Sequence, residues 1–211
     1  DISTEQNLLA LKRMTHALKH RGPDNEQTYI DEHIGLGHTR LSILDLSINA
    51  NQPMESFSKR YIISFNGEIY NHLELRNELF KTSKFNNWGS HSDTSTLVNL
   101  FDYWDIDKIL NKLKGMFAFA LWDKKNKSLF LARDRFGEKP LYYGLLNNQF
   151  MFASELKSLK QNTNFKNKIS QNSVNIFSML HYVPCPYSIY EDIYKLEPAT
   201  YLKIEIEKKI N

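Results

Sequence analysis

The feature that most constrains the fold of this chain is a pair of apolar segments separated by a short polar loop. Met116–Trp122 and Ser128–Arg133 are dense in aromatic and aliphatic residues, and Asp123–Lys127 between them carries only charged and amide side chains. A loop this short joins antiparallel neighbours, because a parallel pair needs a crossover of about a dozen residues or more. The pattern therefore predicts a β-hairpin.

The rest of the chain predicts further strands and a few amphipathic helices. Apolar residues recur at helical spacing over about residues 4–19, after Asn71, which with Glu74 is expected to cap a helix, and again from Asp93 onwards. Strands are expected over 29–34, 34–46, 61–65, 150–153 and 202–206, and the polar segment 156–182 is helix-like. Strands in hairpin order favour an α+β layered domain over an alternating βαβ one. No repeat or linker divides residues 1–211, so we expect one domain.

Composition argues against several classes of function. The 27 basic and 24 acidic residues give a net charge of +3, without any block of five like charges, so nucleic-acid binding is not expected. The longest strongly apolar run, 115–122, is far shorter than the roughly 20 residues of a membrane span. A single cysteine excludes an intramolecular disulfide, and we expect a cytoplasmic protein. His16 and His20 have metal-ligand spacing but no third ligand nearby, so no metal site is expected.

The first candidate site is Asn66-Gly67-Glu68, which directly follows the predicted strand 61–65. An asparagine side chain offers N–H donors, and a glycine lets its backbone N–H approach a ligand closely, so the pair is suited to hold an oxyanion. The alternative is an Asn-Gly turn without a binding role. The expected local order is strand, tight turn, helix.

Two charged residues are the other candidates. Arg40 stands in an otherwise apolar strand, where it either holds a carboxylate or reaches water from a sheet edge. Asp93 stands at the predicted start of a helix, where its carboxylate either caps the helix or binds an ammonium group. Both alternatives stay open at this point.

Two further segments are interpreted as structural. Cys185 lies between prolines, with no helix N-terminus and no neighbouring base to activate its thiol, so we expect it to be inert. Asp134–Pro140 alternates in charge, and we expect an internal salt-bridge network rather than a docking surface.

Six short motifs occur in order along nearly the whole chain: His20–Asp24, Gly37–Asp45, Phe65–Asn71, Ser92–Thr94, Gly115–Ala120 and Ala132–Gly137. Together they resemble the N-terminal glutaminase domain of glutamine-dependent asparagine synthetases, which are class II glutamine amidotransferases. The later segments Tyr182–Pro186 and Lys195–Pro198 are similar to the stretch that leads toward the synthetase domain of those proteins.

The resemblance implies an Ntn-hydrolase fold, a four-layer αββα sandwich with two antiparallel sheets, and release of ammonia from the side-chain amide of L-glutamine. It implies that Arg40 holds the α-carboxylate of glutamine, and that Asp93 and the region of Glu68 hold its α-amino group. It assigns the Asn66 side-chain N–H and the Gly67 backbone N–H to an oxyanion hole. Backbone groups of the following segment are expected to line the pocket, namely Leu41, Ser42, Ile43 and Leu44.

Two parts of the family's machinery are expected outside these residues. The family nucleophile is a cysteine at the N-terminus of the mature chain, on a short strand before the first helix, with the free α-amine as base, whereas this sequence starts at Asp1. The synthetase domain, which binds ATP and Mg²⁺, is the second part, because no phosphate-binding loop occurs here. No cofactor is therefore expected in this domain. The implied partners are L-glutamine and a covalently linked synthetase domain, and a homodimer is left open.

Three functions are compatible with these features. The chain is the glutaminase half of an asparagine synthetase, the glutaminase of a relative that amidates another carboxylate such as one on a surface sugar, or a non-catalytic glutamine-binding module. The sequence of the synthetase part separates the first two functions, and an upstream cysteine separates both from the third.

Overall fold

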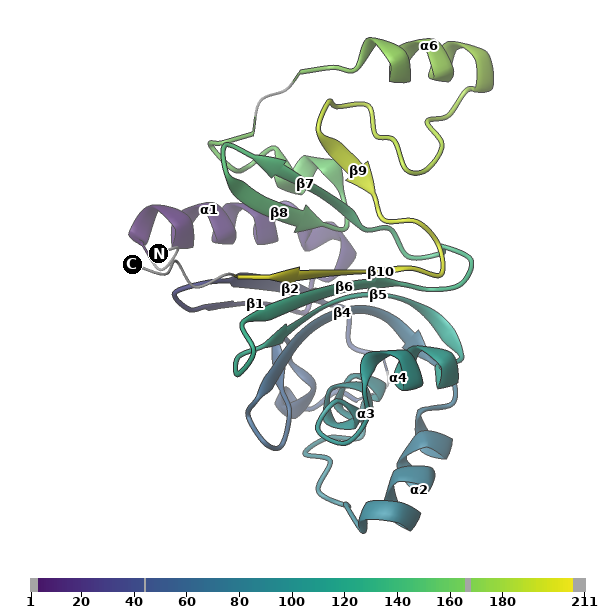
Figure 1. The fold of residues 1–211 in the computed structure, drawn as a ribbon. Helices are drawn as coiled ribbons and strands as arrows, with labels where there is room; N and C mark the ends of the chain where they lie inside the picture. The colour runs from purple at the N-terminus through teal and green to yellow at the C-terminus, as the bar shows by residue number, and fades with distance from the viewer. Residues whose placement is uncertain (1–3, 44, 166–167, 207–211) are drawn as a thin grey trace.

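The computed structural model describes residues 4–43, 45–165 and 168–206. Helices and sheets are stacked in layers (Figure 1). The helices are α1 (Glu5–His16), α2 (His72–Ser83), α3 (Asp93–Leu100), α4 (Ile106–Lys112), α5 (Leu156–Leu159) and α6 (Gln171–Leu180). The strands are β1 (Asn25–Ile30), β2 (Gly35–Arg40), β3 (Met54–Glu55), β4 (Tyr61–Ile69), β5 (Gly115–Asp123), β6 (Ser128–Arg133), β7 (Tyr142–Leu146), β8 (Gln149–Ala153), β9 (Ile193–Lys195) and β10 (Tyr201–Glu205).

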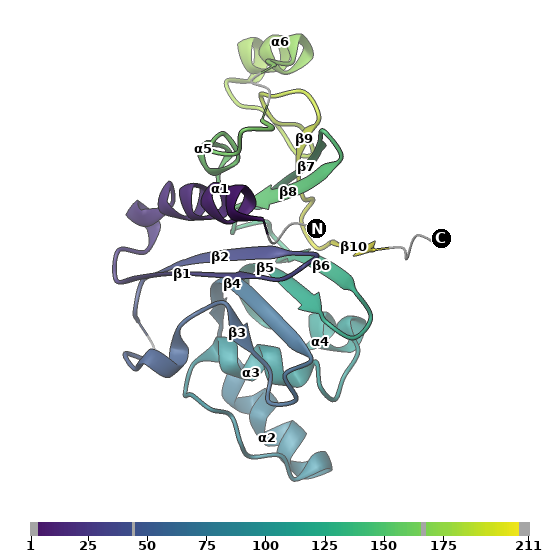
Figure 2. The same cartoon turned by 90° about the vertical axis from the view of Figure 1, so that its left-hand side faces the viewer.

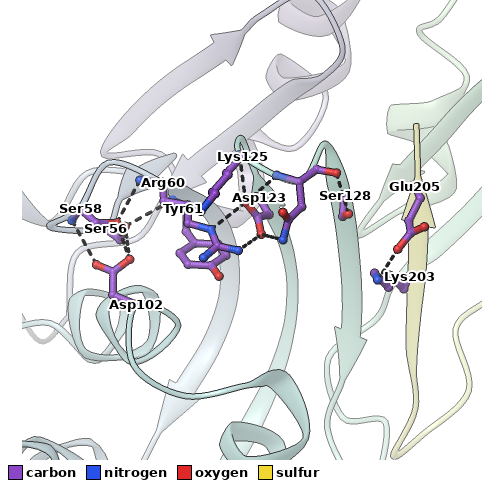
Figure 3. Close-up of polar contacts among 11 residues, drawn as sticks. Ser56, Ser58, Arg60, Tyr61, Asp102, Asp123, Lys125, Ser128, Lys203 and Glu205 are labelled. Atoms are coloured by element: carbon purple, nitrogen blue, oxygen red, sulfur yellow. Dashed lines mark hydrogen bonds and ion pairs between the residues drawn. The ribbon is translucent and has the colours of Figure 1, made fainter. Parts of the chain in front are cut away.

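The central sheet is antiparallel and has the strand order β10-β6-β5-β4-β3. The predicted hairpin is confirmed, with Asp123 of β5 paired to Ser128 of β6. The buried Asp123 carboxylate accepts hydrogen bonds from the backbone N–H groups of Lys125 and Asn126, at 3.0 and 3.1 Å. It also accepts two from the Arg60 guanidinium, at 3.0 and 2.6 Å (Figure 3). The polar loop therefore closes around one carboxylate, which fixes where the hairpin ends.

The two faces of the central sheet belong to different hydrophobic cores. Ile63, Phe65 and Phe119 enter a core that also contains buried residues of α2, α3 and α4. Ile62 and Trp122 point the opposite way, into a core shared with the second layer of strands. This division follows from the alternation of side chains along a strand.

The second layer consists of two separate sheets, β1-β2 and β8-β7-β9, instead of the single sheet that was expected. Helix α1 lies over β1 and β2, and α5 lies beside β8, so the order of layers is helices, sheet, strands, helices (Figure 2). Among the described residues, β2 and β8 each have only one neighbouring strand. Both strands therefore present an unpaired edge within the described part of the chain.

The turn expected at Asn66-Gly67 is absent, and that prediction is wrong. Strand β4 continues to Ile69, with Asn66 opposite Ala118 and Gly67 opposite Phe117 of β5. Pairing with a neighbouring strand over the whole length of β4 overrides the local turn preference of the Asn-Gly pair.

Asn71 is the N-terminal cap residue of α2, as predicted, but its side chain does not form the capping bond, and of the two alternatives for Asp93 the helix cap is excluded. The side chain of Asn71 makes no bond within α2 but links Lys112 O and Lys114 N, at 2.9 Å each. Helix α3 is capped by Ser92, whose Oγ accepts from Ser95 N, while Asp93 is the first helical residue. The Asp93 carboxylate is therefore available for another role.

The 134–140 segment is structural, as expected, but backbone hydrogen bonds hold it instead of salt bridges. The fully buried Asp134 accepts from the backbone N–H groups of Phe117, Phe136, Glu138 and Lys139. Burial disfavours its ionisation, yet these four donors outweigh burial and hold the pKa of Asp134 below its ordinary value.

Several element boundaries differ from the sequence-based predictions. The first helix ends at His16, the strand predicted over 34–46 ends at Arg40, and α4, β7 and β9 were not predicted. The predicted helix-like region 156–182 contains α5 and α6. Within the described ranges, no helix has the length and apolar character needed to cross a bilayer.

Candidate functional site

A cavity of about 700 Å³ is bordered by α1, by β2 and the loop after it, by β4 and β5, and by β8. The unpaired edges of β2 and β8 both belong to its wall. It brings together seven of the residues that the sequence singled out, namely Arg40, Leu41, Ile43, Asn66, Gly67, Glu68 and Asp93. These residues come from three distant parts of the chain.

Strand β4 extends beyond its short neighbour β3, so that its edge over 65–69 has no strand beside it and forms part of the cavity wall. The backbone N–H groups of Phe65, Gly67 and Ile69 point to the same side, because alternate residues of a strand direct their backbone groups alike. Phe65 N–H donates to Oε1 of Gln52 at 2.7 Å, and Ile69 N–H donates to Oδ2 of Asp93 at 2.9 Å. Side chains thus satisfy the outer two donors.

The middle donor, Gly67 N–H, has no acceptor among the described residues. Phe117, which lies opposite Gly67, directs its own N–H and C=O at Asp134 on the far side of β5, at 3.1 and 2.8 Å. A side chain is not tolerated at this position, since a Cβ on Gly67 would lie 2.1 Å from the Met116 carbonyl oxygen, and φ is +156°. The strand pairing therefore requires glycine and leaves its N–H unpaired.

The Asn66 side chain adds a second unpaired donor next to the first. It lies on the face of β4 that looks toward β2, the same face from which the Ser64 hydroxyl donates to Gly37 O at 2.9 Å. Its Nδ2 is buried and has no hydrogen-bond partner among the residues that the structure describes. Buried polar groups are nearly always paired, so this buried donor, next to the Gly67 N–H, indicates a place for an acceptor that comes from outside the described residues. Such a pair is suited to a carbonyl oxygen that becomes negative during a reaction.

Arg40 places a buried positive charge at the cavity wall, with only 8% of its surface exposed. Its Nη1 donates to Ser47 O at 2.8 Å and to Asn51 Oδ1 at 2.7 Å, and its Nη2 donates to Asp45 O. All three acceptors are neutral. No carboxylate of the described residues lies within ion-pair distance of the guanidinium. The alternative of an edge-strand arginine that reaches water is wrong.

Asp93 places a buried negative charge at the same cavity, with 6% of its surface exposed. Its two oxygens accept from Ile69 N and Thr94 N, at 2.9 and 2.8 Å, and among the described residues no basic group is within ion-pair distance. Burial raises the pKa of Asp93, against these two donors and the nearby His72, which lower it. Glu68, half-buried on the same wall, adds to the negative potential.

The loop after β2 was expected to line the pocket with residues 41 to 44. Leu41 and Ile43 line the cavity, whereas Ser42 does not and instead donates its backbone N–H to Asp24 at 2.7 Å. Leu44 lies outside the described residues. The bond from Ser42 ties this loop to the turn that follows α1.

The other chemically notable residues lie apart from this cavity. Cys185 is not among the lining residues, its thiol donates to Lys195 O at 3.5 Å, and burial raises its pKa. His16 and His20 bond separate carboxylates, those of Glu26 and Glu155. Among the residues that the structure describes, no group of three or more His, Cys, Asp or Glu side chains is placed to hold a metal ion.

Among the lining residues that sequence reasoning missed, His38 and Gln52 contact the backbone of β4. His38 donates from Nε2 to Phe65 O at 3.1 Å, and Gln52 accepts from Phe65 N, so both satisfy the open edge of β4. The two-residue period of β2 places His38 on the same face as Arg40, and this signal was available in the sequence. No local pattern marks Gln52, because its role depends on a contact with a strand distant in sequence.

Comparison with known proteins places the chain among amidotransferases. Residues 2–210 match the family described as the glutamine amidotransferase domain. The chain is 40% identical over 194 residues to asparagine synthetase [glutamine-hydrolyzing] 1 of Bacillus subtilis, a match that covers 92% of this chain and 30% of the relative. It is 38% identical over 220 residues to a putative asparagine synthetase of Methanocaldococcus jannaschii, covering 94% of this chain and 41% of the relative. The chain thus spans less than half the length of these relatives.

Two solved structures share the fold at low sequence identity. One is described as the allosteric regulatory enzyme of purine biosynthesis, with a TM-score of 0.63, 19% identity, and coverage of 93% of this chain and 44% of the other. The second is the glutamine phosphoribosylpyrophosphate amidotransferase of B. subtilis, with a TM-score of 0.59, 17% identity, and coverage of 96% and 47%. The predicted α+β fold of the Ntn-hydrolase type is confirmed.

Proposed function

The chain belongs to the glutamine amidotransferase domain family, and from this premise we propose that its cavity binds L-glutamine and positions the side-chain amide for hydrolysis to glutamate and ammonia. The observation that carries the proposal is a set of groups on one cavity wall that lack, among the described residues, either an oppositely charged partner or a hydrogen-bond acceptor. A buried cation, a buried anion and two unpaired N–H donors border the same space.

These groups complement the parts of free glutamine. The Arg40 guanidinium has the forked geometry that suits an α-carboxylate, and the Asp93 carboxylate, with Glu68 nearby, suits an α-ammonium group. The unpaired donors of Asn66 and Gly67 suit the carbonyl oxygen of the side-chain amide. A negative charge that develops on this oxygen during attack would be stabilised there, and loss of one such donor typically lowers turnover about 10²- to 10³-fold.

The nucleophile is proposed to be a cysteine that precedes Asp1 in the natural chain. The cavity supports this proposal, because its wall contains the unpaired edges of β2 and β8, and a strand placed between them would join the two separate sheets. A thiol at the beginning of such a strand would attack the carbonyl carbon of the amide, and its own α-amine would take the thiol proton and pass it to the departing ammonia. Water would then hydrolyse the resulting thioester to glutamate and restore the thiol. The intact mass and N-terminal sequence of the protein purified from its native source test this point.

The ammonia is proposed to serve the ATP-dependent amidation of aspartate to asparagine in the cytoplasm. The support is the similarity to proteins named asparagine synthetases, of which this chain spans the smaller part. ATP and Mg²⁺ belong to the synthetase part of that proposal, and no step at the present cavity depends on them. Ammonia transfer to aspartate, compared with other carboxylate acceptors, distinguishes this function from that of a relative with another acceptor.

The proposed glutaminase is tested with the natural full-length protein by measuring ammonia release from L-glutamine. Arg40→Lys keeps the charge but loses the fork, so we expect a weakening of glutamine binding by roughly 1–3 kcal/mol, about 5- to 150-fold in KM. Arg60→Lys is the matched control, because Arg60 pairs with Asp123 and is not among the cavity residues. Equal KM values in both variants would refute the role of Arg40. Glutamine binding without ammonia release would identify a binding module instead.

A further inference from the structure

Two buried side-chain atoms lack a hydrogen-bond partner in the described part of the chain, and they are of opposite kinds. They are Nδ2 of Asn66, which is a donor, and Nδ1 of His38. Both residues line the same cavity. Buried polar atoms are nearly always paired, so two unpaired atoms on one wall call for a ligand that satisfies both.

The hydrogen-bonding state of His38 follows from its other nitrogen. Nε2 lies 3.1 Å from the Phe65 carbonyl oxygen, which can only accept, so Nε2 carries the hydrogen. Burial lowers the pKa of His38 to about 4, and the nearby Arg40 charge acts in the same direction, so the imidazole is neutral at pH 7. In a neutral ring with hydrogen on Nε2, Nδ1 is a hydrogen-bond acceptor.

His38 and Asn66 are also coupled in space. The carbonyl that accepts from His38 belongs to Phe65, the residue directly before Asn66, so this bond ties β2 to β4 beside the unpaired amide. Donor and acceptor are therefore held by two strands that are fixed to each other. A primary carboxamide presents the complementary pair, an oxygen that accepts and an NH₂ group that donates.

We propose that Nδ1 of His38 accepts a hydrogen bond from the side-chain NH₂ group of L-glutamine while Asn66 and Gly67 donate to its carbonyl oxygen, which makes His38 a specificity-determining residue. The inference rests on the proposed glutaminase function and extends it. L-Glutamate places a carboxylate oxygen, which has no hydrogen to donate, against the lone pair of Nδ1. The site then favours the substrate over its own hydrolysis product, and sites that read a donor in this way discriminate strongly against ligands that lack it.

The experiment measures the KM for glutamine and the inhibition constant for glutamate in the natural full-length protein and in His38→Gln. A glutamine side chain retains an N–H that reaches Phe65 O but has no acceptor at the position of Nδ1. We expect KM to rise about three- to tenfold and the glutamate inhibition constant to fall or stay unchanged. His16→Gln is the control, because His16 is exposed and bonds only Glu26, and both constants should stay at the wild-type values.

A second variant separates recognition from scaffolding. His38→Asn places an amide oxygen near the position of Nδ1 but gives up the bond to Phe65, so it should lower thermal stability while keeping the ratio of the two constants near the wild-type value. The inference would be overturned if the ratio of the glutamate inhibition constant to the KM for glutamine stayed at the wild-type value in His38→Gln. It would also be overturned if both variants lost this ratio and thermal stability to the same extent. Either result would leave the glutaminase function intact. A wild-type protein that releases no ammonia would instead refute the proposed function, and with it this inference.

Discussion

Replacement of Asp93 by asparagine should weaken glutamine binding. The carboxylate is 6% exposed and has no basic partner within ion-pair distance among the described residues, so the ligand's ammonium group would be its counter-ion. Removing one member of a buried charge pair costs about 2–5 kcal/mol, or about 30-fold to several-thousand-fold in affinity. Glu68 stays on the same wall and retains part of the attraction, so we expect the lower half of this range.

The same substitution should change how stability depends on pH in the absence of ligand. Because the folded pKa of Asp93 is raised above 3.8, the folded state holds this proton to higher pH than the unfolded chain does. Folding therefore loses stability as pH rises through the window above 3.8, and Asp93→Asn removes this loss. Asparagine also gives up one of the two backbone hydrogen bonds, which costs about 1 kcal/mol but does not depend on pH.

Urea unfolding at about pH 4 and about pH 7 measures this effect, with calorimetric titration of glutamine at pH 7 beside it. The stability of Asp93→Asn relative to wild type should rise between the two pH values. Asp134→Asn is the comparison, because Asp134 is also buried but four backbone donors lower its pKa. This stabilisation is present above the unfolded pKa of 3.8 and is lost only at lower pH, so the relative stability of Asp134→Asn should stay nearly level between the two pH values. Asp134 does not line the cavity. Unchanged glutamine affinity in Asp93→Asn, or a relative stability that falls with pH, would refute the reasoning.

Two further substitutions test the unpaired donors on β4. Gly67→Ala should lower the free energy of unfolding by about 3 kcal/mol or more, because its Cβ would lie 2.1 Å from Met116 O. Gly89→Ala should lower it by only about 1 kcal/mol, because φ is +74° there but no atom crowds the new Cβ. Equal losses in urea unfolding would contradict the steric argument. Asn66→Ala should lower glutaminase turnover in the natural protein about 10²- to 10³-fold, with little change in KM. Steady-state kinetics measure both values, and a normal turnover would exclude Asn66 from the oxyanion hole.

Much of the candidate site could be predicted because its residues are unusual for their local surroundings. Arg40 is a charge within an apolar strand, and the Asn-Gly pair directly follows a β-branched segment. Their roles stayed ambiguous in the sequence, since a turn and an oxyanion hole share the same two residues. The structure resolves the turn alternative, because pairing with β5 keeps both residues extended.

Sequence reasoning could not find groups whose roles depend on distant partners. His38 and Gln52 both form hydrogen bonds with the backbone of Phe65. These backbone groups have no neighbouring strand on that side of β4, because β3 has only two residues. The expected salt bridges of 134–140 are backbone hydrogen bonds for a related reason. Alternating charges suggest ion pairs, whereas burial of Asp134 beneath four N–H groups depends on the packing of β5.

The sequence by itself determined the layered α+β class, the β5–β6 hairpin and the family, because period-two patterns, a short polar loop and ordered motifs are local properties of the chain. Only the tertiary structure decided that β4 runs through Asn66 and Gly67, that the second layer has two unpaired edges, and that Arg40, Asp93 and His38 meet at one cavity. The physical reason is that backbone hydrogen bonds and buried charges are satisfied by whichever groups the folded chain brings near, and sequence spacing does not encode that distance.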